Sequence, residues 1–134
     1  MEQTPQLSTP EEELAYLRAQ VVEKEAKLAA LGGRALGEPE RAQIISEEVA
    51  AHHVAPEQIL APELRVSEAT KQSEANAILA ELQVGDSEQA IRNLQKTMDE
   101  KGIKNALAVL EKLHAPPLTA DFHRYLVRYI AAGL

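Results

Sequence analysis

Residues 86–134 read DSEQAIRNLQKTMDEKGIKNALAVLEKLHAPPLTADFHRYLVRYIAAGL, and the helix-capping residues in this stretch decide the fold. Asp86 is a favourable N-cap, and Gly102 is a residue type that ends helices. Pro116 and Pro117 end the next helix, because proline disrupts a helix interior, and Leu118 and Thr119 begin a last one. The turn at Gly102 is so short that the two helices it joins must pack as neighbours.

Each of these three predicted helices carries one apolar face at helical spacing. The residues on the three faces are Ile91, Leu94 and Met98; Ile103, Ala106, Leu107, Leu110 and Leu113; and Phe122, Leu126 and Ile130. No window of the sequence alternates apolar and polar residues as a strand does. We therefore expect an all-α protein, a small bundle of five to six helices with a longer N-terminal amphipathic helix.

The N-terminal third divides into a tail and an arm. Residues 1–8 are polar, and we expect a disordered tail there. Residues 9–33 are predicted to be a helical arm, with Thr9 as N-cap, Pro10 in the first turn and Gly32-Gly33 at the end. Its apolar stripe follows a heptad rhythm and comprises Leu14, Leu17, Val21, Leu28 and Leu31. The arm either docks on its own domain, forms a coiled-coil seam with another chain, or folds only with a partner.

Residues 34–134 are expected to form the helical bundle domain. Its first helix starts near Pro39 and buries Ile45 and Val49, and a turn follows between Ala55 and Glu63. The next helix is capped by Ser67 and ends before Gly85. Its buried face is predicted to comprise Ile78, Leu79 and Leu82.

Composition limits the classes of function. The net charge of −7 is uneven: residues 1–85 hold 15 acids against 7 bases, and residues 86–134 hold 6 acids against 7 bases. The acidic part disfavours non-specific nucleic-acid binding. The absence of cysteine excludes disulfides and thiolate metal sites, which favours a reducing compartment. No apolar run is long enough to span a membrane, and no signal-peptide pattern is present, so we expect a cytoplasmic protein without membrane insertion.

The sequence holds no organised reactive centre. His52 and His53 are adjacent, and adjacent side chains on a helix point about 100° apart, so the two rings do not share one metal ion easily. No serine lies in a nucleophile-elbow setting, and no phosphate-binding glycine loop is present. We therefore predict no catalytic, cofactor-binding or metal-binding residues and no small-molecule substrate. A small metal-dependent enzyme, in which His52 or His53 meets carboxylates from another helix, is the remaining enzymatic alternative.

The last helix gathers aromatic and basic residues. Phe122, Tyr125 and Tyr129 alternate with Arg124 and Arg128. Aromatic residues with arginine are typical of protein interfaces and also of single-strand nucleic-acid platforms. Arg124, Tyr125 and Arg128 are therefore candidate partner-binding residues, although the same pattern also fits a helix that has a buried side and a solvated side. Nucleic-acid binding through this helix is the first alternative to a protein-interaction module.

The stretch from Met98 to Ile130 resembles the N-terminal helical region of type IV secretion or conjugation-like ATPase-associated proteins of candidate-phylum bacteria. EKGIKNAL (residues 100–107) and DFHRYLVRYI (residues 121–130) carry the resemblance, and APEQIL (residues 55–60) adds to it. The resemblance covers residues 38–134. It implies an accessory module ahead of a membrane-associated or motor region in a longer chain. No ATPase residues are carried over, because the phosphate-binding loop is absent.

Together these features predict a non-catalytic helical protein-interaction or scaffold module, expected to be a fragment of a larger secretion-like or membrane-associated machine. The expected partner is another protein, or a second copy bound through the N-terminal helix.

Overall fold

Six α-helices and two single-turn 3₁₀-helices make up the regular structure of the residues that this computed structural model describes, 6–34 and 36–134. In chain order they are α1 (Pro10–Gly32), α2 (Glu38–Val54), η1 (Glu57–Ile59), η2 (Pro62–Leu64), α3 (Glu68–Gln83), α4 (Ser87–Lys101), α5 (Ile103–Leu113) and α6 (Pro116–Ala131). The predicted all-α class is confirmed, and α1, with 23 residues, is the long N-terminal helix.

Local capping interactions explain where the helices begin. The Thr9 side chain accepts a hydrogen bond from the backbone N–H of Glu12, and the Glu12 carboxylate accepts one from Ser8 N–H. Asp86 accepts from Gln89 N–H at the start of α4. Each of these side chains satisfies an amide that has no partner inside its helix. The N-caps predicted at Thr9 and Asp86 are therefore confirmed.

The start of α6 differs from the prediction. The helix begins at Pro116, and Thr119 lies inside the first turn, where its hydroxyl donates to the carbonyl oxygen of Ala115. Two prolines fit the first turn because the amides there lack helical partners in any case. The pair therefore begins α6 as well as ending α5.

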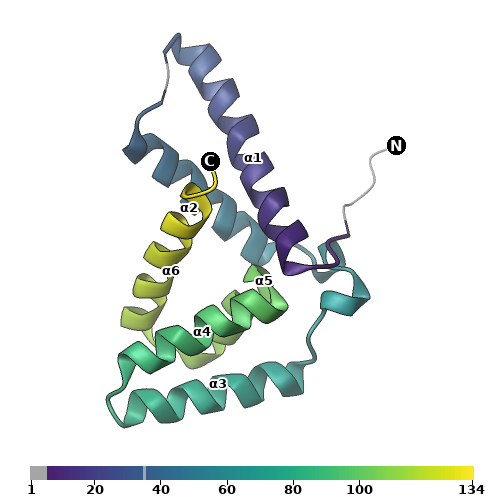
Figure 1. Ribbon diagram of the computed structural model, residues 1–134, viewed down its shortest axis with the longest axis vertical. Helices are drawn as coiled ribbons and strands as arrows, with labels where there is room; N and C mark the ends of the chain where they lie inside the picture. The colour runs from purple at the N-terminus through teal and green to yellow at the C-terminus, as the bar shows by residue number, and fades with distance from the viewer. Residues whose placement is uncertain (1–5, 35) are drawn as a thin grey trace.

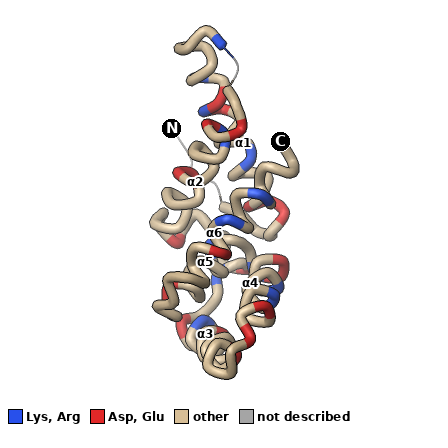
Figure 2. Tube along the Cα trace, turned by 90° about the vertical axis from the view of Figure 1, so that its left-hand side faces the viewer, with Lys and Arg blue, Asp and Glu red and all other residues tan. Residues whose placement is uncertain are grey.

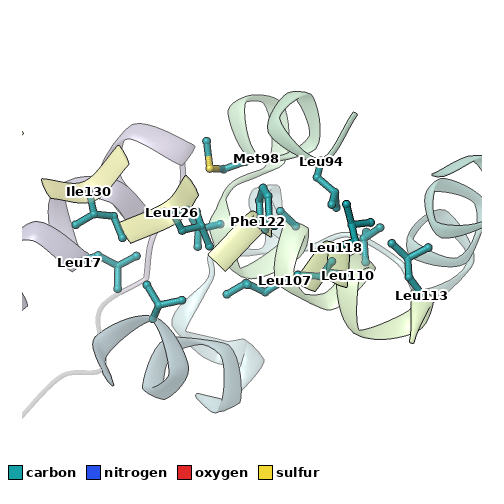
Figure 3. Close-up of a cluster of buried hydrophobic side chains, with 14 of the residues drawn as sticks. Leu17, Leu94, Met98, Leu107, Leu110, Leu113, Leu118, Phe122, Leu126 and Ile130 are labelled. Atoms are coloured by element: carbon teal, nitrogen blue, oxygen red, sulfur yellow. The ribbon is translucent and has the colours of Figure 1, made fainter. Parts of the chain in front are cut away.

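Two groups of three helices form the molecule. Helices α1, α2 and α6 pack on one another in the upper part of Figure 1, and α3, α4 and α5 form the lower part. The contacts of α4 with α6 and of α2 with α5 join the two groups. One apolar cluster runs through both, and Phe122 lies near its centre with Leu126 on one side and Leu118 on the other (Figure 3).

The predicted tail is corrected at its C-terminal end. Leu7 is buried, its N–H donates to the carbonyl oxygen of Ile59, and its own carbonyl oxygen accepts from Ala61 N–H. Leu7 also joins a small apolar cluster with Ile59, Leu60 and Leu64. The segment before α1 is therefore anchored on the chain between α2 and α3, and residues 1–5 of the predicted tail lie outside the described residues.

The buried face of α3 is rotated from the predicted one. Ile78 is buried as expected, but Leu79 is 40% exposed and Leu82 is only half-buried. Lys71 and Ala75 lie on the buried side instead. Lys71 is held there by Glu68 in its own helix and by Glu57 of η1, so its charge is paired at the edge of the core.

An acid-sensitive contact joins the start of α3 to α5. The carboxylate of Glu68 accepts a hydrogen bond from Lys112 at 2.9 Å and one from Lys71 at 3.3 Å. Both bonds lower the pKa of Glu68, and the bond from Lys112 has the larger effect. A carboxyl group whose pKa is lowered by folding stabilises the fold above its unfolded-state pKa, about 4.5, and this contribution is lost as the pH falls through the lower folded value.

We therefore expect wild type to have a higher urea midpoint than Glu68→Gln at neutral pH and the same midpoint in strong acid. Urea unfolding of both proteins across the acid range measures the difference, with Glu100→Gln as the control for removing an exposed acid. If the two urea midpoints differ by the same amount down to the lowest pH, the ionised Glu68 carboxylate is not the source of the acid sensitivity.

Candidate interaction surfaces

The predicted stripe on the N-terminal helix divides into a buried part and an exposed part. Leu17 and Val21 are 1% and 0% exposed and belong to the same core cluster as α6. Leu14 packs against this cluster and is half-buried. The structure therefore corrects two predictions. Leu17 and Val21 are buried and are not accessible to a partner. Residues 9–33 are not a part separate from the bundle, because α1 packs into the same core.

The other part of the stripe lies on a projecting end of α1. Leu28 is 46% exposed and Leu31 is 85% exposed. Ion pairs hold α1 against α2 at Lys24, which meets Glu48, and at Glu25, which meets Arg41. After Glu25 the last turns of α1 extend past the start of α2 and past the C-terminal end of α6 (Figures 1 and 2). This projection, Ala26–Gly32, is about 10 Å long at about 1.5 Å per residue.

Helix α6 ends beside α1, where Arg18 caps it. The Arg18 guanidinium donates from Nε to the carbonyl oxygen of Ile130 at 3.1 Å and from Nη2 to that of Tyr129 at 2.9 Å. These are carbonyls of the last turn, which lack partners inside the helix, and a cation there also favours the helix dipole. The level of Arg18 therefore marks how far α6 covers α1.

A buried carboxylate joins α1 to the start of α5. Glu13 is 0% exposed, and its carboxylate accepts from the backbone N–H groups of Ile103 and Lys104, the latter at 2.9 Å. Its Oε2 also lies 2.6 Å from Nε2 of the buried His52. Helix α5 has glycine at its N-cap position and no local capping side chain, so Glu13 supplies the cap from another helix.

The position of Glu13 in the sequence signals this buried role. Glu13 lies four and eight residues before Leu17 and Val21, so it continues the buried face of α1 by one turn. An acid on an apolar face needs buried hydrogen-bond donors.

Lys104 caps the C-terminal end of α2 in the same region. The Lys104 ammonium donates to the carbonyl oxygens of His52, His53 and Ala55 at 2.7–3.1 Å. Burial lowers the pKa of this lysine, and the nearby Glu13 charge opposes that effect. Glu13, His52 and Lys104 thus tie the ends of three helices together.

The histidines are engaged in separate contacts. His53 Nε2 lies 3.0 Å from the Glu111 carboxylate, and Ser46 Oγ lies 2.8 Å from Nε2 of His123. Among the described residues, no three His, Cys, Asp or Glu side chains are grouped so that they could hold a metal ion. The structure brings one carboxylate from another helix to each of these histidines, Glu13 of α1 to His52 and Glu111 of α5 to His53. Among the described residues, neither pair is joined by a third such side chain.

The candidate residues of α6 lie on its outer side with unequal exposure. Arg124 is exposed and pairs with Asp121 one turn earlier, and Arg128 is exposed. Tyr125 is half-buried, stacked between Phe122 and Tyr129 at ring-centroid distances of 6.0 and 5.8 Å. Burial, with a smaller effect from Asp99, raises the pKa of Tyr125. Tyr125 is therefore part of an ordered aromatic stack.

A small cleft lies beside this stack, between the first turn of α1, the C-terminal end of α4 and the outer side of α6. Its volume is about 220 Å³. Its apolar lining comprises Leu14, Met98, Ile103 and Tyr129, and its two carboxylates are Glu11 and Asp99. The fold thus brings Leu14 of the predicted stripe next to Tyr129 of α6, which stacks on the candidate residue Tyr125.

Charges of opposite sign are interspersed over the chain (Figure 2). Arg18 caps α6, Arg124 pairs with Asp121, and Lys101 pairs with Glu74. These three basic residues are thus engaged with protein groups, whereas Arg128, next to Tyr129, is exposed. A single-strand nucleic-acid platform combines aromatic residues with a positively charged groove.

Comparison of the chain with protein-family models, with curated proteins and with solved structures found no match. Across the part of the chain that the structure describes, no helix combines the length and the apolarity that crossing a membrane requires.

Proposed function

We propose that this protein is a non-catalytic helical interaction module that binds a protein partner through the projecting end of α1. The observation that carries the proposal is the exposure of Leu28 and Leu31 on a helix segment that no other helix covers (Figure 1). Apolar surface left in water costs about 25 cal/mol per Å², and a partner that covers it recovers this free energy.

The arrangement of α1 indicates how a partner would bind. Leu28 lies on the face that Leu17 and Val21 define, because the three positions are separated by four and seven residues. Helix α6 ends at the level of Arg18, and the face stays buried as far as Val21. A partner helix packed beyond that level would continue the same helix–helix interface along α1, with its own apolar residues against Leu28 and Leu31.

The ion pairs at the base of the projection support a preformed binding element. Arg41 meets the Glu25 carboxylate with two nitrogens, at 2.8 and 3.1 Å, and Lys24 pairs with Glu48. A two-bond guanidinium–carboxylate pair fixes orientation as well as distance. A partner would thus meet a helix whose direction is already fixed, which lowers the entropic cost of binding.

The resemblance of residues 38–134 to a helical region of secretion-associated proteins supports a place in a larger machine. On that basis we propose a scaffold or adaptor role, on the cytoplasmic side of such an assembly, rather than the motor itself.

Site-specific crosslinking tests the proposal. A photo-reactive amino acid at position 31 in the host cell is expected to give an adduct of one defined mass, either with another protein or with a second copy, identified by mass spectrometry. The same residue at position 84 is the control, because Val84 is 81% exposed and lies beyond α3, away from α1. No adduct at position 31, or the same adducts at both positions, would contradict the proposal.

Leu28→Asp is expected to abolish the position-31 adduct while leaving the fold intact. Leu28 is 46% exposed, and a substitution at such a site changes stability by about 0.5 kcal/mol or less. Thermal unfolding checks that the fold is intact. Light scattering over a concentration series shows whether a wild-type dimer is lost in the variant. An adduct that survives Leu28→Asp would place the contact elsewhere.

A further inference from the structure

The cleft between α1, α4 and α6 combines an apolar floor with an acidic rim. Leu14, Met98, Ile103 and the Tyr129 ring form the floor, and the carboxylates of Glu11 and Asp99 lie at the edge. Both acids are exposed. No lysine or arginine is among the residues that line the cleft.

Two carboxylates give the rim a negative charge. Asp99 lies in the last turn of α4, where the helix dipole contributes a partial negative charge. The negative charge of Asp99 also acts on the neighbouring aromatic stack, where it adds to the effect of burial in raising the pKa of Tyr125. Of the cations near this region, Lys101 pairs with Glu74, and Arg18 caps the end of α6 with its guanidinium 5.9 Å from the centre of the Tyr129 ring. A cation at the rim would therefore meet two carboxylates and no lysine or arginine among the lining residues.

The size of the cleft selects a side chain rather than a whole ligand. Pockets for small molecules have volumes of about 300–1,000 Å³, and this one has about 220 Å³. Lysine and arginine bury an apolar stem and keep their charged end at the surface, which matches an apolar floor beneath an acidic rim.

We infer that this cleft binds a lysine or arginine side chain of a partner polypeptide, with the stem against Leu14, Met98 and Ile103 and the cation beside Glu11 and Asp99. The inference shares with the proposed function only the idea of a protein partner. It concerns the opposite end of α1 from Leu28 and Leu31, so the two contacts are independent.

Methionine-methyl NMR tests the inference directly. The sequence holds two methionines, Met1 and Met98, so the Met98 methyl signal is easily assigned and reports on the floor of the cleft. The probe is Nα-acetyl-lysine N-methylamide, and the matched control is the norleucine analogue, which has the same stem without the charge. We expect a saturable shift of the Met98 signal with the lysine probe in the millimolar range and a much weaker response to norleucine.

Charge removal at the rim completes the test. Asp99→Asn or Glu11→Gln alone is expected to weaken binding of the lysine probe about 2–5-fold, as for an exposed ion pair, and the double variant to abolish saturation. Glu88→Gln, at the other end of α4, should bind as wild type. Equal binding of the two probes, no saturable shift, or unchanged binding by the double variant would overturn the inference. None of these results bears on crosslinking at position 31.

Discussion

Glu13→Ala is expected to lower the free energy of unfolding by about 3–5 kcal/mol, a large loss for a residue in the first turn of a helix. The carboxylate is fully buried and accepts from two backbone amides of α5 as well as lying 2.6 Å from His52. Alanine leaves the amides of Ile103 and Lys104 and the His52 ring nitrogen buried without an acceptor, and each such group costs about 1–3 kcal/mol.

Urea unfolding of the purified variant measures this loss. Glu11→Ala is the matched control, because Glu11 lies in the same turn but is exposed, and we expect it to change stability by about 0.5 kcal/mol or less. Glu13→Gln should fall between the two, since the amide keeps one acceptor oxygen for the α5 amides but carries no charge. A loss below about 1 kcal/mol for Glu13→Ala would show that the cap on α5 contributes little to the fold.

Helix boundaries were predictable because their causes are local. Thr9, Asp86 and Ser67 cap helices through bonds to amides three residues later, and Gly33 ends α1 in the left-handed conformation. A residue and its partner a few positions away are visible together in the sequence, so these helix limits followed from single positions, whereas the start of α6 did not.

The interactions between helices could not be predicted in the same way. Glu13 and Ile103 are 90 positions apart, and no local pattern joins them. Leu17 and Leu28 share one stripe and one residue type, yet the first is 1% and the second 46% exposed. The difference depends on where α6 ends, which Arg18 and the carbonyls of α6 fix only in the folded chain. The sequence therefore predicted an apolar face on α1 but not which part of it is free.

Gly102→Ala is expected to cost about 3–5 kcal/mol, the sum of backbone strain and loss of the Glu13 cap. Gly102 has φ +94° and ψ 169°, a conformation essentially confined to glycine. A Cβ at this position would also overlap the Glu13 carboxylate. Gly85→Ala is the matched control: its φ is +83°, but the space around it is open, so we expect strain alone, about 1–3 kcal/mol.

A double-mutant cycle separates the two causes at Gly102. In the Glu13→Ala background the carboxylate that a Cβ at position 102 would displace is already gone, so Gly102→Ala should then cost only its backbone strain. The combined loss is therefore expected to be smaller than the sum of the single losses by about 1 kcal/mol or more, as for residues in direct contact. Urea unfolding of the four proteins measures the coupling. Simple additivity would mean that the turn at Gly102 and the cap from α1 act independently, and that glycine is required there for its backbone conformation alone.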